Sequence, residues 1–354
     1  MAKWDKERLP RENGEIVDMQ TPIIVSASRS TDIPAFYADW FFHRLDVAGY
    51  SAWINPFNGV RSYVSYKNTH FIVFWSKNPE PLIKYLPILK RKGIGCYIQY
   101  SLNDYETEGL EKNVPPLSKR IETFKKLVKC LGPGHVIWRF DPLVLTNQIN
   151  INTLLSKIEN IGDQLLGYTE KLVFSFVDIE TYAKVLSNLK KSNIQYINWT
   201  EELMREFANK LVRLNEKWHY ELATCCEDIE LENVNHNHCI DDELIIRLAF
   251  EDKVLMEHLN VKILPIHEAN LFGEKKAIPN QAIMLPNGRY AIHGNNRDKG
   301  QRLFCGCIKS KDIGEYNTCI HGCEYCYANT SKKAALNNFR SHKVNPLSET
   351  ITGR

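Results

Sequence analysis

Three closely spaced cysteines near the end of the chain form the clearest chemical motif in the sequence. Cys319, Cys323 and Cys326 stand in a C-x3-C-x2-C pattern, and Tyr325 directly precedes the third cysteine. An odd number of thiols leaves a disulfide framework incomplete, whereas three thiolates suit three corners of a cubane iron–sulfur cluster. Such a cluster keeps one iron open to a further ligand. The alternative is a zinc site, which needs a fourth ligand such as His321.

The spacing of these cysteines resembles the signature of radical S-adenosylmethionine (radical-SAM) enzymes. In that family the open iron binds the amino and carboxylate groups of S-adenosylmethionine, and reduction cleaves the sulfonium to an adenosyl radical. The resemblance implies that Cys319, Cys323 and Cys326 bind a catalytic [4Fe–4S] cluster and that Tyr325 lies near the adenine. It also implies an electron donor such as a flavodoxin or a ferredoxin.

Four further cysteines could form a second metal centre. They are Cys225, Cys239, Cys305 and Cys307. Together they supply the four thiolates of a tetrahedral metal site or of a cluster. Gly306 allows the backbone between the last two to fold closely around a metal. The sequence leaves a second iron–sulfur cluster, zinc and reduced thiols without a ligand as alternatives.

The elements that must position these thiols alternate along the chain. Short β-branched or aromatic runs, each followed by a polar turn and a helix-like segment, begin at Ile23. The runs are residues 23–27, 51–54, 71–75, 96–100, 136–140, 172–176 and 220–224. Most are continuously apolar, which is typical of strands buried on both faces. The alternation predicts a parallel α/β sheet, and about seven strands favour a TIM-like (β/α) barrel, complete or partial, over a doubly wound sheet.

Two amphipathic helices are predicted between these runs, over residues 121–131 and 203–214, with Thr200 as the N-cap of the second. A further helix-compatible segment covers residues 241–250. We expect Cys96, within a strand, and Cys130, on an apolar helix face, to be core residues.

Polar residues follow most of the apolar runs. In a parallel barrel the ends of all strands meet at one rim, where active sites lie. The residues that we single out there are Ser28, Arg29, Asp32, Lys77, Arg139 and Asp141. Lys77, Arg139 and Asp141 are the candidate catalytic residues, since the two cations could hold a carboxylate or phosphate. Salt bridges between neighbouring strands are the alternative.

Several longer stretches resemble the bacterial family known as domain of unknown function 1848. They are residues 26–37, 74–79, 138–142 and 301–329. The resemblance extends from about Pro22 to the end of the chain and implies a C-terminal cysteine cluster, but no reaction. Residues 251–300 depart from the family pattern by being longer. The loop at 323–328 alone is also similar to the cluster loop of spore-photoproduct-lyase-like radical-SAM proteins.

The position of the cysteine motif conflicts with the usual radical-SAM order, in which it follows the first strand. A circularly permuted barrel would resolve the conflict, with residues 312–318 leading into the cluster loop and residues 334–340 forming the next helix. The run at 23–27 would then be the second strand. In the family, a Gly-Gly-Glu-like segment after that strand holds the methionyl ammonium. Here residues 28–32 replace it, so we expect Asp32 to pair with the ammonium and Ser28 and Arg29 to border the cofactor.

Four segments are expected along the 354 residues. They are a lead (1–20), a barrel body (21–250), an insertion or lid containing a hairpin turn at 285–290 (251–300), and a cysteine-rich segment that completes the barrel (301–354). The net charge of +3 does not require a polyanionic partner, so nucleic acid is possible but not indicated. We see no signal peptide or membrane span and expect a cytoplasmic protein.

The leading functional hypothesis is a radical-SAM-like iron–sulfur enzyme that acts on an unknown substrate. The alternative is a non-catalytic zinc or iron–sulfur protein that binds nucleic acid through basic and aromatic side chains. A third reading is a hydrolase that uses Asp141, Asp178 or Glu227 as carboxylate catalysts.

Overall fold

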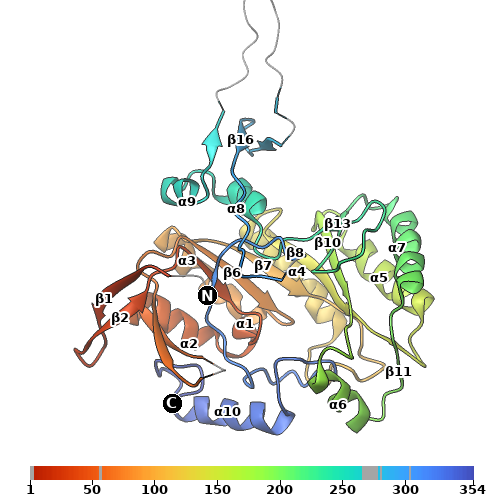
Figure 1. Ribbon diagram of the computed structural model, residues 1–354, viewed down its shortest axis with the longest axis horizontal. Coiled ribbons are helices and arrows are strands. Elements are labelled where there is room, and N and C mark those ends of the chain that lie inside the picture. Colours follow the sequence, from red (N-terminus) through yellow and green to blue (C-terminus); the bar gives the residue numbers. More distant parts are fainter. Residues whose placement is uncertain (1–3, 56–57, 265–277, 280, 303) are drawn as a thin grey trace, which may run out of the picture.

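A parallel sheet of eight strands organises the molecule, for which the computed structural model describes residues 4–55, 58–264, 278–279, 281–302 and 304–354 (Figure 1). In sheet order the strands are Asn235–His236 (β13), Glu221–Thr224 (β12), Lys171–Phe176 (β10), Val136–Leu143 (β8), Gly95–Ser101 (β7), Phe71–Ser76 (β6), Ile24–Ala27 (β3) and Lys311–Asp312 (β17). Every pairing between neighbours is parallel. The predicted parallel α/β sheet is therefore confirmed.

The last strand of the sheet in sequence lies beside the first. β17 pairs with β3 in parallel, with Lys311 opposite Val25 and Asp312 opposite Ser26. A circularly permuted barrel would require this pairing between the last and the first strand of the sheet. The strand order of the described residues ends at β13 and β17 without a pairing between them, so a closed barrel stays a prediction.

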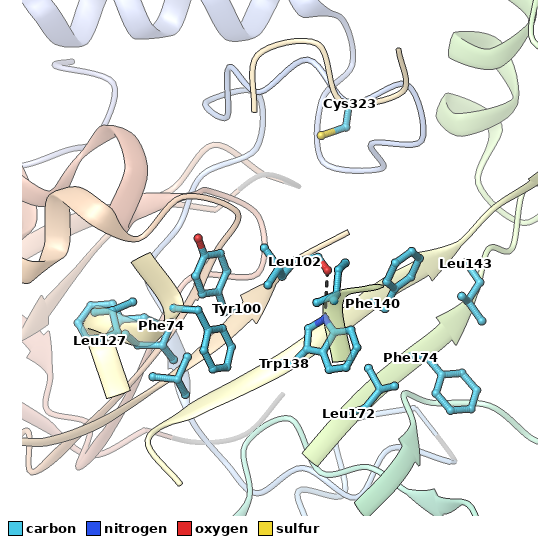
Figure 2. Close-up of a cluster of buried hydrophobic side chains, with 14 of the residues drawn as sticks. Phe74, Tyr100, Leu102, Leu127, Trp138, Phe140, Leu143, Leu172, Phe174 and Cys323 are labelled. Atoms are coloured by element: carbon cyan, nitrogen blue, oxygen red, sulfur yellow. Dashed lines mark hydrogen bonds between the residues drawn. The ribbon is translucent and has the colours of Figure 1, made fainter. Parts of the chain in front are cut away.

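One face of the sheet carries the main hydrophobic core. Alternate side chains share a face of a strand, and on this face they include Ile72, Phe74, Ile98, Tyr100, Trp138, Phe140, Leu172 and Phe174 (Figure 2). The helical segments of this part of the chain are Ile33–Phe36 (α1), Ala38–His43 (α2), Arg44–Ala48 (η1), Glu80–Tyr85 (η2), Leu86–Lys92 (α3), Leu117–Leu131 (α4), Ile151–Leu165 (α5), Ala183–Lys191 (α6) and Glu201–Asn215 (α7). Apolar side chains from most of them complete this core.

The opposite face is apolar in one half and polar in the other. A second core joins Val73, Tyr97, Ile137 and Val173 to the helix α8 (Asp242–Ala249). Two residues further along each strand, the same alternation places a more polar set on this face. That set is Trp75, Gln99, Arg139, Ser175 and Cys225. Polar groups thus gather toward the carboxyl ends of the strands.

The helix predictions are largely confirmed. α4 and α7 cover the two predicted amphipathic segments, and the Thr200 hydroxyl accepts a hydrogen bond from the Leu203 amide at 3.3 Å as the N-cap. Cys96 is buried in β7 as expected. The expectation for Cys130 is wrong, because this thiol is exposed near the end of α4.

The N-terminal part differs from the sequence prediction. Lys6–Pro10 (β1) and Ile16–Gln20 (β2) join Arg61–Ser65 (β5) and Tyr50–Ile54 (β4) in a separate sheet of order β1-β2-β5-β4. No strand was predicted in the lead, because its charged side chains and half-exposed alternation do not resemble a buried strand. The run at 51–54 is a strand, but its assignment to the parallel sheet is wrong, since β4 pairs with β5 in an antiparallel ladder.

The described residues between 251 and 300 form a small unit that lies with α8 above the sheet in Figure 1. Its elements are Lys253–His258 (α9), Lys262–Ile263 (β14), Ile283–Met284 (β15) and Tyr290–Ile292 (β16). The predicted hairpin is confirmed, because β15 and β16 pair antiparallel and the Gly288 amide donates to the Leu285 carbonyl at 2.9 Å. Residues 265–277 and 280 of the proposed lid lie outside the described residues, and its role as a lid stays a prediction.

The remaining elements are a two-stranded pair, Leu145–Thr146 (β9) with Tyr196–Ile197 (β11), and the C-terminal helix Lys332–Val344 (α10). α10 packs against α1 through Phe339 and His342, whose rings lie 5.9 and 4.7 Å from that of Tyr37. Among the described helices, none is both long and apolar enough to cross a membrane.

Candidate metal centres at the strand ends

The three clustered cysteines lie in the loop that joins β17 to α10. The loop begins where β17 ends at Asp312, and it ends at Ser331, whose hydroxyl accepts from the Ala334 amide at 3.0 Å as the N-cap of α10. Because β17 is parallel to β3, the loop starts at the carboxyl end of the sheet. Active sites of parallel α/β folds lie at this end.

The three thiols are brought together within this loop. Ionisation of Cys319 or Cys326 would raise the pKa of Cys323, and the Cys326 amide donates to the Cys323 carbonyl at 3.3 Å. Cys323 belongs to the main core, and Figure 2 shows its side chain on the cysteine loop, apart from the strands that are drawn. Burial raises the pKa of each of the three thiols. Three buried, neighbouring thiols on one loop fit the ligand set of a cubane cluster with one open iron.

The Asp312 carboxylate, at the start of the cysteine loop, binds residues at and after the end of β3. It accepts from the Ser26 hydroxyl at 2.9 Å, the Ser28 hydroxyl at 2.7 Å and the Arg29 amide at 3.0 Å. A Cβ on Gly314 would lie 1.9 Å from the Ser28 oxygen, so only glycine fits there. Ser28 and Arg29 therefore stand directly beside the start of the cysteine loop, and their contact with a cofactor stays a prediction.

Asp32 links three segments through a fully occupied carboxylate. It accepts from the Ala35 amide at 3.0 Å, the Ser76 hydroxyl at 2.7 Å, the Lys77 amide at 2.8 Å and His321 Nε2 at 2.7 Å. Burial alone would raise the pKa of Asp32, but the hydrogen bond and charge of His321, together with the hydrogen bonds from Ser76 and the Lys77 amide, lower the pKa. The structure thus ties the ends of β3 and β6 to the cysteine loop.

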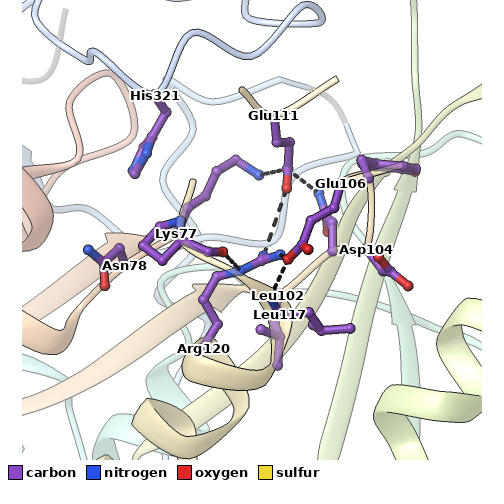
Figure 3. Close-up of polar contacts among 12 residues, drawn as sticks. Lys77, Asn78, Leu102, Asp104, Glu106, Glu111, Leu117, Arg120 and His321 are labelled. Atoms are coloured by element: carbon purple, nitrogen blue, oxygen red, sulfur yellow. Dashed lines mark hydrogen bonds and ion pairs between the residues drawn. The ribbon is translucent and has the colours of Figure 1, made fainter. Parts of the chain in front are cut away.

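Lys77 belongs to a buried polar network beside the cysteine loop, drawn in part in Figure 3. Lys77 Nζ lies 2.7 Å from Glu111 Oε1 and donates to the Tyr325 hydroxyl at 2.9 Å. The Tyr325 hydroxyl donates to the same Glu111 oxygen, and Asn103 Nδ2 donates to it at 3.1 Å. Arg120 Nη1 lies 3.8 Å from the other oxygen. The aromatic residue of the cysteine motif is therefore held by two buried charges of opposite sign.

Glu324 anchors the other side of the cysteine loop. Its side chain is 1% exposed and lies 2.6 Å from Lys332 Nζ and 3.0 Å from Lys112 Nζ. The Ser192 hydroxyl, at the end of α6, donates to it at 2.7 Å. A buried carboxylate needs such partners to remain charged, so these contacts fix the loop between α6 and α10.

Arg139 and Asp141 lie at the second group of cysteines rather than the first. Arg139 Nε donates to Asp141 Oδ2 at 3.0 Å, while Arg139 Nη1 donates to Gln99 Oε1 at 3.1 Å and to Cys239 Sγ at 3.4 Å. Asn103 connects the two regions, because its oxygen accepts from the Asp141 amide at 2.9 Å. The candidate catalytic residues are thus divided between two neighbouring sites.

Cys225, Cys239, Cys305 and Cys307 are brought together on the polar side of the sheet. Cys225 Sγ and Cys239 Sγ lie 3.2 Å apart, the Cys239 amide donates to Cys307 Sγ at 3.2 Å, and Cys305 lies two residues before Cys307. The four residues predicted as a set are therefore neighbours.

Of the three carboxylates proposed for a hydrolase, Glu227 has the most unusual environment. Burial raises the pKa of Glu227 to about 7, although it accepts a hydrogen bond from the Phe176 amide at 2.9 Å. Asp178 is exposed. Asp141 is engaged by Arg139 and by the Ser175 hydroxyl.

Sequence reasoning missed the buried partners of the predicted residues. They are Glu111, Arg120, Asp312 and Glu324. The roles of these four residues could not be recognised from a motif, because each role depends on a contact with residues that are distant in the sequence. Glu324 had one signal, its position within the cysteine motif. Asn103 was visible only as one of many polar residues after a strand.

Comparison with known proteins places the chain in a family without naming a reaction. Neither the curated proteins nor the solved structures contain a match to this chain. A family match covers residues 24–328, which include the whole parallel sheet and both groups of cysteines. The chain therefore belongs to the family described as "Domain of unknown function (DUF1848)".

Proposed function

We propose that this protein is a radical-SAM-like iron–sulfur enzyme. In this proposal Cys319, Cys323 and Cys326 hold a [4Fe–4S] cluster, and S-adenosylmethionine binds its open iron. When bound and reduced, such a cluster supplies the electron that breaks the sulfonium bond of S-adenosylmethionine and releases methionine. An electron donor such as a flavodoxin or a ferredoxin would reduce it. The substrate is not identified.

One observation carries this proposal. The loop with the three thiols follows a strand of the parallel sheet, lies next to the end of the neighbouring strand β3, and is followed by a helix. This arrangement of strand, cysteine loop and helix is the one that the radical-SAM resemblance implies for a permuted barrel. We accordingly regard the sheet as a partial, permuted (β/α) barrel.

The surroundings of His321 favour a cluster with three ligands over zinc. A zinc site would need His321 as its fourth ligand, with one ring nitrogen free to bind the metal. Nε2 of His321 lies 2.7 Å from Asp32 Oδ2, and Nδ1 lies 3.4 Å from the Asn113 carbonyl oxygen. Both nitrogens thus face protein partners outside the cysteine loop.

The chain's own residues would hold this site in shape. Lys77 places a positive charge near Cys323, which opposes the effect of burial and favours its thiolate form. Asp32 and Tyr325 have protein partners at all of their polar atoms, so in this proposal they position the loop beside the cofactor. Ser28 and Arg29 border the same loop and remain candidates for cofactor contacts.

Metal analysis and electron paramagnetic resonance (EPR) test the cluster and its open iron together. After anaerobic reconstitution we expect a brown protein with about four irons for this centre. Adding S-adenosylmethionine to the reduced protein should change the EPR spectrum, because the open iron gains two ligands. A colourless protein with stoichiometric zinc would contradict the proposal. So would an iron-replete protein whose EPR spectrum does not change when S-adenosylmethionine is added.

Asp32→Asn is expected to weaken S-adenosylmethionine binding about ten- to a hundredfold. The change removes the charge that holds His321 and the Lys77 backbone, and a charge-assisted hydrogen bond contributes on the order of 1.5–3 kcal/mol. Iron content should stay near that of the wild type, because all three thiols remain. Titration of reconstituted protein with S-adenosylmethionine measures the effect.

Asp178→Asn provides the control for that titration. Asp178 also follows a strand of the sheet, but it is exposed and accepts from the Thr181 amide at 3.2 Å. We expect it to bind the cofactor like the wild type. Equal affinities of the two variants would show that Asp32 has no part in the cofactor site.

A further inference from the structure

A second group of four thiols lies on the polar side of the sheet, apart from the cysteine loop. Cys307 is 1% exposed and Cys239 is 7% exposed, while Cys225 and Cys305 are half-buried. The separation of 3.2 Å between the sulfurs of Cys225 and Cys239 is well beyond a disulfide bond of about 2.05 Å. The Cys239 amide donates to the Cys307 sulfur at 3.2 Å, and Cys305 lies two residues before Cys307 in the sequence, so the four residues are linked from Cys225 to Cys239, Cys307 and Cys305.

Nitrogen donors are aimed at the two most buried sulfurs. Cys307 Sγ accepts from the Cys239 amide at 3.2 Å and from the Ile240 amide at 3.4 Å. Cys239 Sγ accepts from Asn237 Nδ2 and from Arg139 Nη1, each at 3.4 Å. A neutral thiol is a weak acceptor, whereas a thiolate is a strong one. Four donors on two sulfurs therefore suit metal-bound thiolates.

Positive charge and close backbone packing complete this environment. The Arg29 guanidinium lies 5.3 Å from the Trp75 ring, and its positive charge favours the thiolate forms of Cys239, Cys305 and Cys307. A Cβ on Gly306 would lie 2.1 Å from the His238 ring. Glycine thus allows Cys305 and Cys307 to turn toward the same point.

The four residues come from opposite ends of the strand order. Cys225 directly follows β12 and Cys239 follows β13, at one end of the sheet. Cys305 and Cys307 precede β17, at the other end. The Ile308 amide donates to the Ile240 carbonyl at 3.1 Å, so the two segments already touch. A metal bound there would fasten them together.

We propose that Cys225, Cys239, Cys305 and Cys307 form a second, four-thiolate metal centre that joins the segments next to the two edge strands. The ligand is a thiol-seeking metal, either one zinc ion or an iron–sulfur cluster, both of which four thiolates can hold. This centre does not depend on the proposed radical-SAM function, because it uses none of the same ligands.

A variant without the first centre tests the second directly. Cys319→Ala, Cys323→Ala and Cys326→Ala are combined, and the protein is reconstituted anaerobically, once with zinc and once with iron and sulfide. We expect the triple variant to retain one zinc ion or about four irons, with sulfur as the only ligand in X-ray absorption spectra. Retention in the zinc arm alone identifies zinc, and retention in the iron arm with a cluster spectrum identifies a cluster. A triple variant that binds neither metal overturns the proposal, as does a disulfide between Cys225 and Cys239.

A second variant tests whether this metal centre joins the segments next to the two edge strands. Cys305→Ser and Cys307→Ser together should remove that metal and speed amide exchange in β13 and β17, because metal binding contributes to folding. Cys130→Ser, which removes an exposed thiol of α4, is the control and should change neither. Unchanged metal content in the double variant would refute these ligands, and unchanged exchange after metal loss would refute the fastening role. Should the double variant not fold, the triple variant alone decides.

Discussion

Cys323→Ala is expected to remove the proposed catalytic cluster while leaving the fold in place. Two thiolates cannot hold a cubane with one open iron, so iron bound at this centre should fall from about four per chain to none. The effect of S-adenosylmethionine on the EPR spectrum should disappear with it. Iron and sulfide analysis of anaerobically reconstituted protein measures the loss.

Cys96→Ala is the matched control for this experiment. Cys96 and Cys323 are both buried thiols of the main core, so each substitution creates a similar small cavity. Cys96 lies within β7, away from the cysteine loop in sequence. We expect its variant to keep the wild-type iron content. A Cys323 variant that retains its iron would show that this residue is not a ligand.

Glu111→Gln is expected to destabilise the protein by about 3–5 kcal/mol, because it removes the carboxylate that pairs with Lys77 and one of the two carboxylates near the buried Arg120. The Glu111 side chain is 1% exposed, and it lies 2.7 Å from Lys77 Nζ and 3.8 Å from Arg120 Nη1. Arg120 is itself only 1% exposed. Urea unfolding of the wild type and the variant gives the difference in free energy.

Glu206→Gln on α7 provides the control, since its ion pair with Lys210 is also 2.7 Å long but 45% of the Glu206 side chain is exposed. Exposed pairs of this kind contribute about 0.3–0.5 kcal/mol. Similar losses in the two variants would mean that the Glu111 network is solvated, contrary to this account.

The same carboxylate gives a pH dependence with a defined sign. Burial alone would raise the pKa of Glu111, but the charges of Lys77 and Arg120 outweigh it and lower the pKa from 4.5 to about 2. Its stabilisation is therefore complete above pH 4.5 and is lost as the pH falls from 4.5 toward 2. Across that interval the wild type should lose about 3 kcal/mol more than Glu111→Gln.

The parallel sheet was predictable because its strands are short, continuous apolar runs between amphipathic helices. The same reasoning failed for β1 and β2, whose polar residues do not resemble a buried strand and which form a sheet by pairing β1 with β2 and β2 with β5. It also placed β4 in the wrong sheet, since an apolar run does not reveal its partner.

Both groups of cysteines could be chosen from residue type and spacing, but their surroundings could not. Glu111 lies 34 residues from Lys77 in the sequence, and Asp312 lies 284 residues from Ser28. The first pair depends on the neighbouring positions of β6 and β7, and the second arises only when β17 returns to the side of β3. The four occupied hydrogen bonds of Asp32 likewise depend on Ser76, Lys77 and His321 meeting around it.

The formation of 5′-deoxyadenosine tests the central claim most directly. Reconstituted wild-type protein is reduced with dithionite under anaerobic conditions, supplied with S-adenosylmethionine, and sampled over time, with Cys323→Ala treated identically. The account predicts that the wild type forms 5′-deoxyadenosine and methionine in equal amounts, slowly even without substrate, and that the variant forms neither. An iron-replete wild type that produces no 5′-deoxyadenosine, with or without cell extract as a source of substrate, would contradict it.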